Sequence, residues 1–340
     1  MKAAVLKKTG EISELMQNLS VMEVPEPEIS STDVIVSLNY SALNHRDIWI
    51  TKGLYPKIDL PVIPGSDGCG TIVEKGSSVT EFNLGDSVII NPCLDWGFRQ
   101  THQSKKMSIL GMPVNGTFAE YVKINKANVF MKPSSLTSLE AAAIPLCGLT
   151  AYRALFNRAD LKNGENVLIT GIGGGVASLA MIFAIAHGAA VYVTSGNNEK
   201  IELAKQLGAV GGANYNNPDW DKEILKLANN DIQVIVDGTG GKIFNKLVDI
   251  INYGGRIASY GATLGNPDKF ALNKIFWKQI TISGATLGSP SDFMNMVLFF
   301  ELNKIKPVID EVYDLQMIHQ AMFRMNNGEQ FGKIVIKNME

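Results

Sequence analysis

The chain has 340 residues, of which 46% are hydrophobic, and its 31 basic and 33 acidic residues leave a net charge of -2. This length exceeds what one hydrophobic core usually covers, so we expect two domains. The near-neutral charge argues against binding to nucleic acid or to a membrane surface, and no apolar run approaches membrane-spanning length. The three cysteines lie far apart, which argues against a disulfide scaffold and favours a reducing cytoplasm.

The first third of the chain is predicted to be mostly β-structure. Short apolar runs suited to strands occur at residues 3–5, 34–37, 70–73, 87–90 and 118–122, and Gly, Pro, Asn and Asp residues separate them. Prolines cluster in the connections, where a missing backbone N–H does least harm. This composition favours a compact, partly open β-barrel over residues 1–125.

Strands and helices alternate from about residue 136 onward. After helices at 138–144 and 150–158, strands are expected at 167–170, 190–194, 232–236, 256–259 and 279–283, with helices at 199–207, 220–227 and 242–251. This alternation is typical of a doubly wound parallel sheet covered by helices on both faces. Helices at 291–303 and 317–326 and a strand at 333–336 form a tail that is too short for a domain, and we expect it to return to the first domain.

A glycine-rich turn links the first strand of this alternation to a helix. Residues 167–170 form an apolar, β-branched run, residues 171–175 read GIGGG, and apolar residues at helical spacing begin at residue 176. This order places free backbone N–H groups and the positive end of a helix at one point, which favours a phosphate or pyrophosphate. A plain loop also suits so many glycines, but the flanking strand and helix match the dinucleotide-binding pattern.

Six short motifs carry a family resemblance through their order and spacing. They are residues 44–47 (NHRD), 53–56 (GLYP), 64–68 (PGSDG), 148–153 (GLTAYR), 171–177 (GIGGGVA) and 331–335 (FGKIV). On these motifs the chain resembles the medium-chain dehydrogenase/reductase superfamily, and its zinc-free quinone-oxidoreductase branch most closely. The resemblance implies a GroES-like β-barrel catalytic domain from residues 1–125 and 289–340, and a Rossmann NADP-binding domain from residues 126–288. It also implies an active site in the cleft between the domains, and homodimers or homotetramers whose Rossmann sheets meet edge to edge.

The resemblance also bears on zinc. Alcohol dehydrogenases of this superfamily hold a catalytic zinc with Cys, His and Cys at positions that correspond to Asn44, Ser66 and Leu146, the last one residue before Cys147. A catalytic zinc needs three good nitrogen, sulfur or carboxylate ligands. A structural zinc needs four closely spaced cysteines, and Cys93 is the only cysteine in residues 91–111. We therefore expect no bound metal, and we expect Cys147 to be a small buried hydrophobic residue.

The second Rossmann strand indicates which nicotinamide cofactor is used. An NAD-selective site carries Asp or Glu at the end of that strand, and Ser195 stands there instead. Ser195, Lys200 and Tyr215 match positions that NADPH-using quinone oxidoreductases employ, so the resemblance favours NADPH over NADH, although Lys200 also suits a solvated helix face. The other cofactor contacts that we expect are His45, Thr150, Gly171, Gly174, Gly175, Val176, Tyr260 and Phe331.

Three residues are candidates for the reacting end of the site. Asn44 occupies the former first zinc-ligand position, so its amide either points at the substrate oxygen or braces the loop before Asp47. Tyr55 matches a tyrosine that lines the cleft in quinone oxidoreductases, and its phenol would donate to an enolate-like oxygen, although tyrosines in Pro-rich loops also simply pack. Asp47 belongs to the same motif as Asn44, and a structural role that bonds backbone N–H groups or an arginine is favoured for it.

These features predict an NADPH-dependent oxidoreductase that reduces quinones or α,β-unsaturated carbonyl compounds by hydride transfer without a metal. Without zinc, an unactivated alcohol is a poor substrate, because nothing lowers its pKa. Two alternatives stay open: a zinc-type alcohol dehydrogenase, and an NADPH-binding sensor with little catalysis. The expected partner is a small-molecule electrophile, with neither nucleic acid nor membrane.

Overall fold

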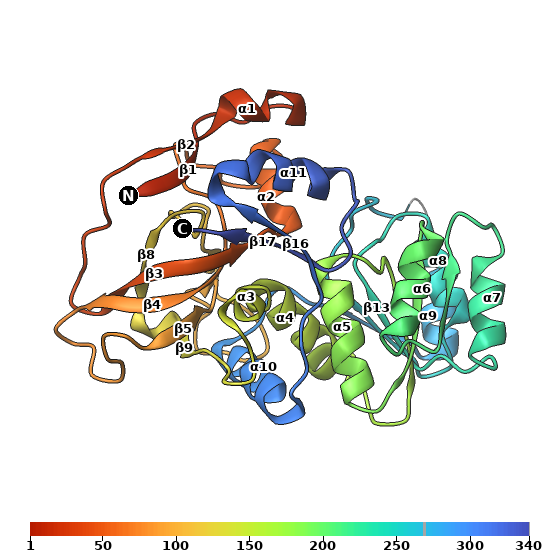
Figure 1. Ribbon diagram of the computed structural model, residues 1–340. Coiled ribbons are helices and arrows are strands. Elements are labelled where there is room, and N and C mark those ends of the chain that lie inside the picture. The colour runs from red at the N-terminus through yellow and green to blue at the C-terminus, as the bar shows by residue number, and fades with distance from the viewer. Residues whose placement is uncertain (268–269, 340) are drawn as a thin grey trace. The chain divides into compact units, whose positions relative to one another are not determined.

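The computed structural model describes residues 1–267 and 270–339, and the chain divides into two compact units (Figure 1). The first unit comprises Met1–Cys147 and Gly288–Glu340, and the second comprises Gly148–Leu287. The first boundary falls later than residue 125 because α3 (Ser138–Ala142) packs against strands of the first unit. Glu340, which ends the predicted catalytic domain, lies outside the described residues.

The first unit is built on a seven-stranded sheet. Its order is β16-β17-β3-β4-β5-β9, and β8 pairs with β3 off this path. Only the β16–β17 pair is parallel within this sheet, and two smaller antiparallel pairs join β1 to β2 and β6 to β7. The bounds are β1 Lys2–Leu6, β2 Leu19–Glu23, β3 Asp33–Ala42, β4 Asp67–Lys75, β5 Ser87–Ile90, β6 Cys93–Leu94, β7 Ser108–Ile109, β8 Tyr121–Asn125, β9 Val129–Met131, β16 Ile309–Asp314 and β17 Lys333–Lys337.

Two large apolar cores and a small cluster of Ala42, Ala143 and Val335 stabilise this unit. Alternate residues of β3, Val34, Val36 and Leu38, point into one core with residues of β4, β5 and β8, as the two-residue period of a strand requires. The other core combines β1, α2, α11 and β17. The helices that begin in this unit are α1 Leu15–Asn18, α2 His45–Thr51, α3, α4 Pro145–Tyr152, α10 Pro290–Asn303 and α11 Ile318–Asn326, and short 3-10 turns occupy Ile12–Glu14, Lys126–Asn128 and Leu315–Met317.

The second unit contains a six-stranded sheet in which every pair of neighbours is parallel. The strand order is β12-β11-β10-β13-β14-β15, so the chain starts in the middle, moves to one edge and then fills the other side. The bounds are β10 Asn166–Ile169, β11 Ala190–Ser195, β12 Gly211–Asn214, β13 Val234–Asp237, β14 Arg256–Ser259 and β15 Thr281–Gly284. This is the doubly wound order of a Rossmann fold, and it confirms the predicted class.

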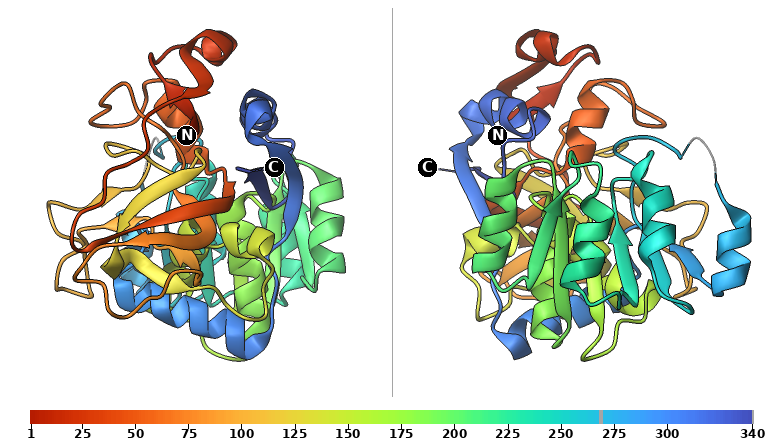
Figure 2. Two further views of the ribbon diagram at one scale, coloured as in Figure 1. Left: turned by 60° about the vertical axis from the view of Figure 1, so that its left-hand side comes forward. Right: turned by 90° about the vertical axis from the view of Figure 1, so that its right-hand side faces the viewer.

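Helices cover this sheet, as Figure 2 (right) shows in green and cyan. α5 (Gly175–Ala186) packs against β10 and β11, and α6 (Asn198–Gln206) packs against β11 and β12. α7 (Trp220–Leu227) and α8 (Ile243–Ile250) share an apolar core with β10, β13 and β14. α9 (Leu272–Lys278) precedes the edge strand β15. Apolar runs thus form buried strands here because helices exclude water from the sheet.

Several elements differ from the sequence prediction. The helix expected at 150–158 is the end of α4 followed by a π-helical segment, Arg153–Arg158. α2 and β12 were not predicted, since α2 is short and β12 begins with two glycines. A Cβ at Gly212 would lie 2.8 Å from Val193, so close packing between strands explains the glycine there. Among the described residues, no helix is long and apolar enough to cross a membrane.

Candidate functional site

The glycine turn of the second unit leaves backbone N–H groups available at the start of α5. Gly171 and Gly173 have φ of +67° and +112°, which side chains other than hydrogen rarely allow. Gly174 is the N-cap of α5, and its position makes no side-chain cap. Gly175 and Val176 then begin the helix, where the first N–H groups have no intrahelical partner. The predicted turn residues therefore form a backbone site suited to a phosphate group.

Two of the three residues expected to meet a 2′-phosphate lie at neighbouring strand ends. Ser195 is the last residue of β11, and Tyr215 directly follows β12. A Cβ at Gly196 would lie 2.7 Å from the Tyr215 hydroxyl, so the phenol packs over this glycine. The Ser195 hydroxyl accepts a hydrogen bond from the backbone N–H of Asn197 at 3.2 Å, and it keeps its own proton for another acceptor. Lys200 lies near the beginning of α6.

A buried carboxyl group, which the sequence analysis missed, lies between two central strand ends of the same sheet. Asp237 ends β13 and accepts hydrogen bonds from the Thr170 hydroxyl at 2.6 Å and from the N–H groups of Thr239 and Gly240 at 3.1 Å. Burial raises the pKa of Asp237, and the hydrogen bonds, led by that of Thr170, act in the opposite direction. β10 and β13 flank the reversal of strand order, where such sheets bind dinucleotides.

The other expected cofactor residues lie in both units. In the second unit, Tyr260 follows β14, its ring would lie 2.3 Å from a Cβ on Gly238, and Thr150 is buried in α4. In the first unit, His45 starts α2 and its ring meets the Trp49 ring edge-on at 5.2 Å. Phe331 precedes β17 and is 8% exposed. The turn residues, Ser195, Tyr215 and Tyr260 thus share the carboxyl edge of one sheet.

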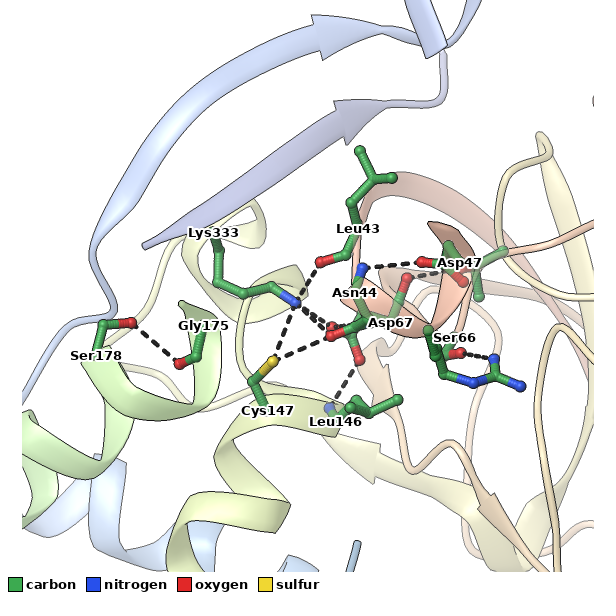
Figure 3. Close-up of polar contacts among 12 residues, drawn as sticks. Leu43, Asn44, Asp47, Ser66, Asp67, Leu146, Cys147, Gly175, Ser178 and Lys333 are labelled. Atoms are coloured by element: carbon green, nitrogen blue, oxygen red, sulfur yellow. Dashed lines mark hydrogen bonds and ion pairs between the residues drawn. The ribbon is translucent and has the colours of Figure 1, made fainter. Parts of the chain in front are cut away.

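The first unit carries a buried polar cluster around Lys333 (Figure 3). The Lys333 side chain is 1% exposed, and its ammonium nitrogen lies 2.7 Å from both the Leu43 carbonyl oxygen and Asn44 Oδ1. The same nitrogen lies 2.8 Å from Asp67 Oδ2 and 3.6 Å from Cys147 Sγ. Burial lowers the pKa of Lys333, but Asp67, Cys147 and Asp47 together outweigh it, and the pKa is raised. We call these five residues the Lys333 cluster.

Asn44 uses its side-chain amide inside the Lys333 cluster. Its Oδ1 also accepts from the Cys147 thiol at 3.1 Å, and its Nδ2 donates to Asp67 Oδ2 at 3.0 Å. The backbone N–H of Asn44 donates to Asp47 Oδ2 at 2.8 Å, which fixes the first turn of α2. Burial raises the pKa of Asp47 to about 6, and the nearby Arg46 charge lowers it. These contacts correspond to the bracing role considered for both residues.

Arg46, also missed by the sequence analysis, lies beside Tyr55. Its Nη1 donates to Ser66 Oγ at 2.6 Å and to the Leu110 carbonyl oxygen at 3.0 Å, and the Ser66 hydroxyl donates to the same carbonyl at 2.8 Å. The guanidinium carbon lies 4.9 Å from the centroid of the Tyr55 ring. Arg46 is 8% exposed, and its Nε and Nη2 have no hydrogen-bond partner among the described residues. Such buried donors are costly unless a ligand uses them.

Zinc does not fit the side chains at the expected ligand positions. The Asn44 amide oxygen faces an ammonium group, and the Ser66 hydroxyl is bonded to Arg46 and Leu110. A catalytic zinc requires three good nitrogen, sulfur or carboxylate ligands. In the part of the chain that the structure describes, no group of three or more His, Cys, Asp or Glu side chains is placed to hold a metal ion. The donor chemistry therefore does not match that of a catalytic zinc site.

At the third expected metal-ligand position, it is the side chain of Cys147, and not that of Leu146, that contacts Asn44 and Lys333. Leu146 donates its backbone N–H to Asp67 Oδ1 at 2.7 Å, while the Cys147 thiol meets Asn44 and Lys333. The prediction that Cys147 is only a small buried hydrophobic residue is therefore incomplete. Burial raises the pKa of the Cys147 thiol to about 11, although the Lys333 charge acts in the opposite direction. Cys147 is thus a neutral hydrogen-bond donor at neutral pH.

The sequence contained little signal for the two basic residues of this region. Lys333 begins an apolar strand, where a lysine usually marks the solvated end, and only its place in the FGKIV motif set it apart. Arg46 lies within the NHRD motif, but a short helix gives no indication of which side chain is buried. Ser66 and Asp67 belong to the PGSDG motif, and the resemblance singled out only the first of them.

Two family descriptions match the chain. The alcohol dehydrogenase GroES-like domain matches residues 30–134, and the zinc-binding dehydrogenase family matches residues 175–301. The chain is 35% identical to the zinc-type alcohol dehydrogenase-like protein YogA of Leptosphaeria maculans, over 97% of this chain and 96% of that protein. It is 28% identical to an acryloyl-coenzyme A reductase of Metallosphaera sedula, over 99% of both chains.

A solved structure has the same fold throughout. It is a crystal structure of an NAD-dependent alcohol dehydrogenase with a TM-score of 0.92 and 35% identity, and the match covers 99% of each chain. These similarities confirm that a GroES-like domain accompanies the Rossmann sheet. The glycine turn lies in the second unit and the Lys333 cluster in the first.

Proposed function

Because the chain belongs to the medium-chain dehydrogenase/reductase superfamily, we propose that it is an NADPH-dependent reductase of quinones or α,β-unsaturated carbonyl compounds that uses no metal ion. Membership alone makes it an oxidoreductase that depends on a nicotinamide dinucleotide. The proposal adds the choice of NADPH, the conjugated acceptor and the absence of a metal from the reaction.

One observation carries the proposal: the side chains at two metal-ligand positions are already bonded to other protein groups. Asn44 Oδ1 accepts from Lys333, and the Ser66 hydroxyl is held between Arg46 and Leu110. An isolated carbonyl or an alcohol needs strong polarisation for hydride transfer, which a metal ion commonly supplies. A conjugated acceptor spreads the new negative charge over an enolate, so hydrogen-bond donors suffice. The similarity to an acryloyl-coenzyme A reductase supports this class of acceptor.

We assign Arg46 and Tyr55 to the substrate oxygen. Arg46 offers two buried nitrogens, Nε and Nη2, whose N–H groups have no partner among the described residues, and the Tyr55 ring lies against its guanidinium group. Preorganised donors of this kind stabilise a developing oxyanion, typically by about 3–4 kcal/mol each. A bound nicotinamide supplies the hydride. Asn44 acts indirectly in this proposal, because it fixes the start of the helix that carries Arg46.

The choice of NADPH rests on the end of β11. Ser195 replaces the carboxylate that binds ribose hydroxyls in NAD-selective sites, and a carboxylate there would repel a 2′-phosphate. The Ser195 hydroxyl, the Lys200 ammonium and the Tyr215 phenol would supply donors and positive charge to that phosphate. One similar crystal structure is described as NAD-dependent, so both cofactors belong in the test.

The experiment is a kinetic panel with NADPH and NADH against quinones, enones, enals and simple alcohols, run after chelation and after addition of zinc. We expect NADPH oxidation with conjugated acceptors, unchanged by chelator, and a fall in kcat/KM of about 100-fold or more for Tyr55→Phe, the loss of one preorganised oxyanion donor. Tyr253→Phe is the matched control, because Tyr253 is 70% exposed. It should leave the rate unchanged.

Two outcomes would contradict the proposal in different ways. Alcohol oxidation that requires stoichiometric zinc would favour the alcohol dehydrogenase alternative, which several similar proteins carry in their names. Tight NADPH binding without turnover on any acceptor would favour a sensor. Equal use of NADH and NADPH would remove the argument from Ser195 but leave the metal-free chemistry standing.

A further inference from the structure

The centre of the Lys333 cluster has a geometry that the proposed function does not use. Side chains of Asn44, Asp67 and Cys147 converge on one point, and the Lys333 ammonium nitrogen lies at that point (Figure 3). Asn44 stands where the family resemblance places the first metal ligand, and Cys147 stands next to the third. The three residues come from three separate segments, and Lys333 from a fourth.

The ammonium group satisfies this site completely. A lysine ammonium has three N–H donors, and the contacts to Leu43, Asn44 and Asp67, at 2.7, 2.7 and 2.8 Å, use all three. The Cys147 sulfur is a longer, fourth contact at 3.6 Å, so the nitrogen lies at the point on which all four groups converge. Asp67 neutralises its charge, and both side chains are 0–1% exposed. A metal ion at the same point would clash with the nitrogen and would be repelled by its charge.

We propose that the Lys333 ammonium is a built-in replacement for a bound metal ion. It holds Asn44, Asp67 and Cys147 around one positive charge, keeps divalent cations out, and thereby fixes the start of α2. Lys333 is thus a positioning residue, since its donors are used within the protein. The inference extends the metal-free part of the proposed function, but its readouts do not depend on hydride transfer, so the two can fail separately.

The first test uses the wild-type protein and Co²⁺, which reports on thiolate ligands through sulfur-to-cobalt charge-transfer absorption. Excess Co²⁺ should produce no such absorption in the wild-type protein and no stoichiometric metal after dialysis. Lys333→Ala removes the ammonium but keeps Asp67 and Cys147, and it should bind Co²⁺ at least about tenfold more tightly. The double variant Lys333→Ala/Cys147→Ser should lose the sulfur absorption, which assigns the ligand.

The second test replaces the missing ammonium from solution. Lys333→Ala should regain thermal stability and weaken its Co²⁺ binding when ethylammonium or propylammonium is added, because these cations fit the vacated site. Lys333→Met is the matched control, because it fills much of the space without charge, and alkylammonium should have no effect on it. Tetramethylammonium, which has no N–H donor, should rescue neither variant.

A third measurement covers the case in which Lys333→Ala does not fold. Removing one partner of a buried ion pair should lower Tm by about 5–15 °C, whereas the neutral pair Lys333→Met/Asp67→Leu should recover part of that loss. Stoichiometric Co²⁺ with sulfur absorption in the wild-type protein would overturn the inference, and so would a Lys333→Met variant as stable as wild type. A change confined to the Kd of NADPH would also overturn it, since it would make Lys333 a cofactor contact.

Discussion

The glycine turn of the second unit and the Lys333 cluster of the first are both polar sites, but the turn is built from backbone groups and the cluster mainly from side chains. In the turn, the groups suited to a phosphate are backbone N–H groups, and the residues that supply them, 171–176, are consecutive. In the cluster, most of the polar groups belong to side chains, and Lys333 contacts partners that lie 186 to 290 positions away in the sequence. Local backbone chemistry leaves a motif in the sequence, whereas a long-range polar cluster leaves isolated residues.

The largest expected effect comes from removing Asp67, the counter-ion of Lys333, which tests whether the cluster stabilises the first unit. Asp67→Asn leaves the Lys333 ammonium buried without a carboxylate, and we expect it to lose about 3–5 kcal/mol in the free energy of unfolding. Denaturant unfolding measures the change. Asp160→Asn is the control, because it removes an ion pair with Lys162 whose side chains are more than half exposed, and it should cost little. Equal losses in the two variants would mean that the buried Lys333–Asp67 pair stabilises the protein no more than an exposed ion pair does.

The buried carboxyl group next to the cluster provides a pH test. The pKa of Asp47 is raised to about 6 from 3.8, so its contribution to stability is present below about pH 4 and is lost as pH rises through about 6. Wild type should therefore lose up to about 3 kcal/mol relative to Asp47→Asn across that interval. Unfolding at stepped pH measures the difference. For Glu81→Gln, the difference from wild type in the free energy of unfolding should not change above pH 5, because the pKa of Glu81 is lowered to about 2. A difference that is also independent of pH for Asp47→Asn would refute the raised pKa of Asp47.

The glycine turn is tested by adding a side chain where φ is positive. Gly173→Val forces a valine to φ near +112°, and it places methyl groups beside the N–H groups of α5. We expect the Kd of NADPH to rise about 30-fold, the equivalent of about 2 kcal/mol. Gly164→Val is the matched control: it has φ of +82° and open space around it, so it shares the backbone strain but should leave the Kd unchanged. Fluorescence titration of NADPH decides between them.

The finest distinction concerns the cofactor itself. Lys200→Ala should raise the Kd of NADPH about tenfold and leave that of NADH nearly unchanged, because only NADPH carries the 2′-phosphate. Lys205→Ala is the control, since Lys205 lies later on the same helix and pairs with Glu202. Titrations with both cofactors measure the ratio. Losses of equal size for NADPH and NADH would remove Lys200 from the phosphate site.

Particular elements show how far the sequence could be read. The strands at 87–90 and 256–259 and the helix at 220–227 were predicted with the bounds that the structure has, because apolar periodicity and flanking turn residues agree there. β12 was missed because its two glycines follow from close packing, Gly211 against Leu227 and Gly212 against Val193, and not from strand propensity. α2 was missed because it is short, and because the NHRD motif that caps it was interpreted only as part of the functional site.

By itself, the sequence determined the alternation of strands and helices, the glycine turn and the superfamily. The first two follow from neighbouring residues, whose spacing sets periodicity and backbone freedom, and the superfamily follows from the resemblance that six short motifs carry. Only the tertiary structure decided which polar side chains are buried together. Lys333 and Arg46 look like ordinary surface residues in the sequence, and their roles arise where β17, α2, β4 and α4 converge. Burial and charge pairing depend on distance in space, and residues hundreds of positions apart carry no record of that distance in their order.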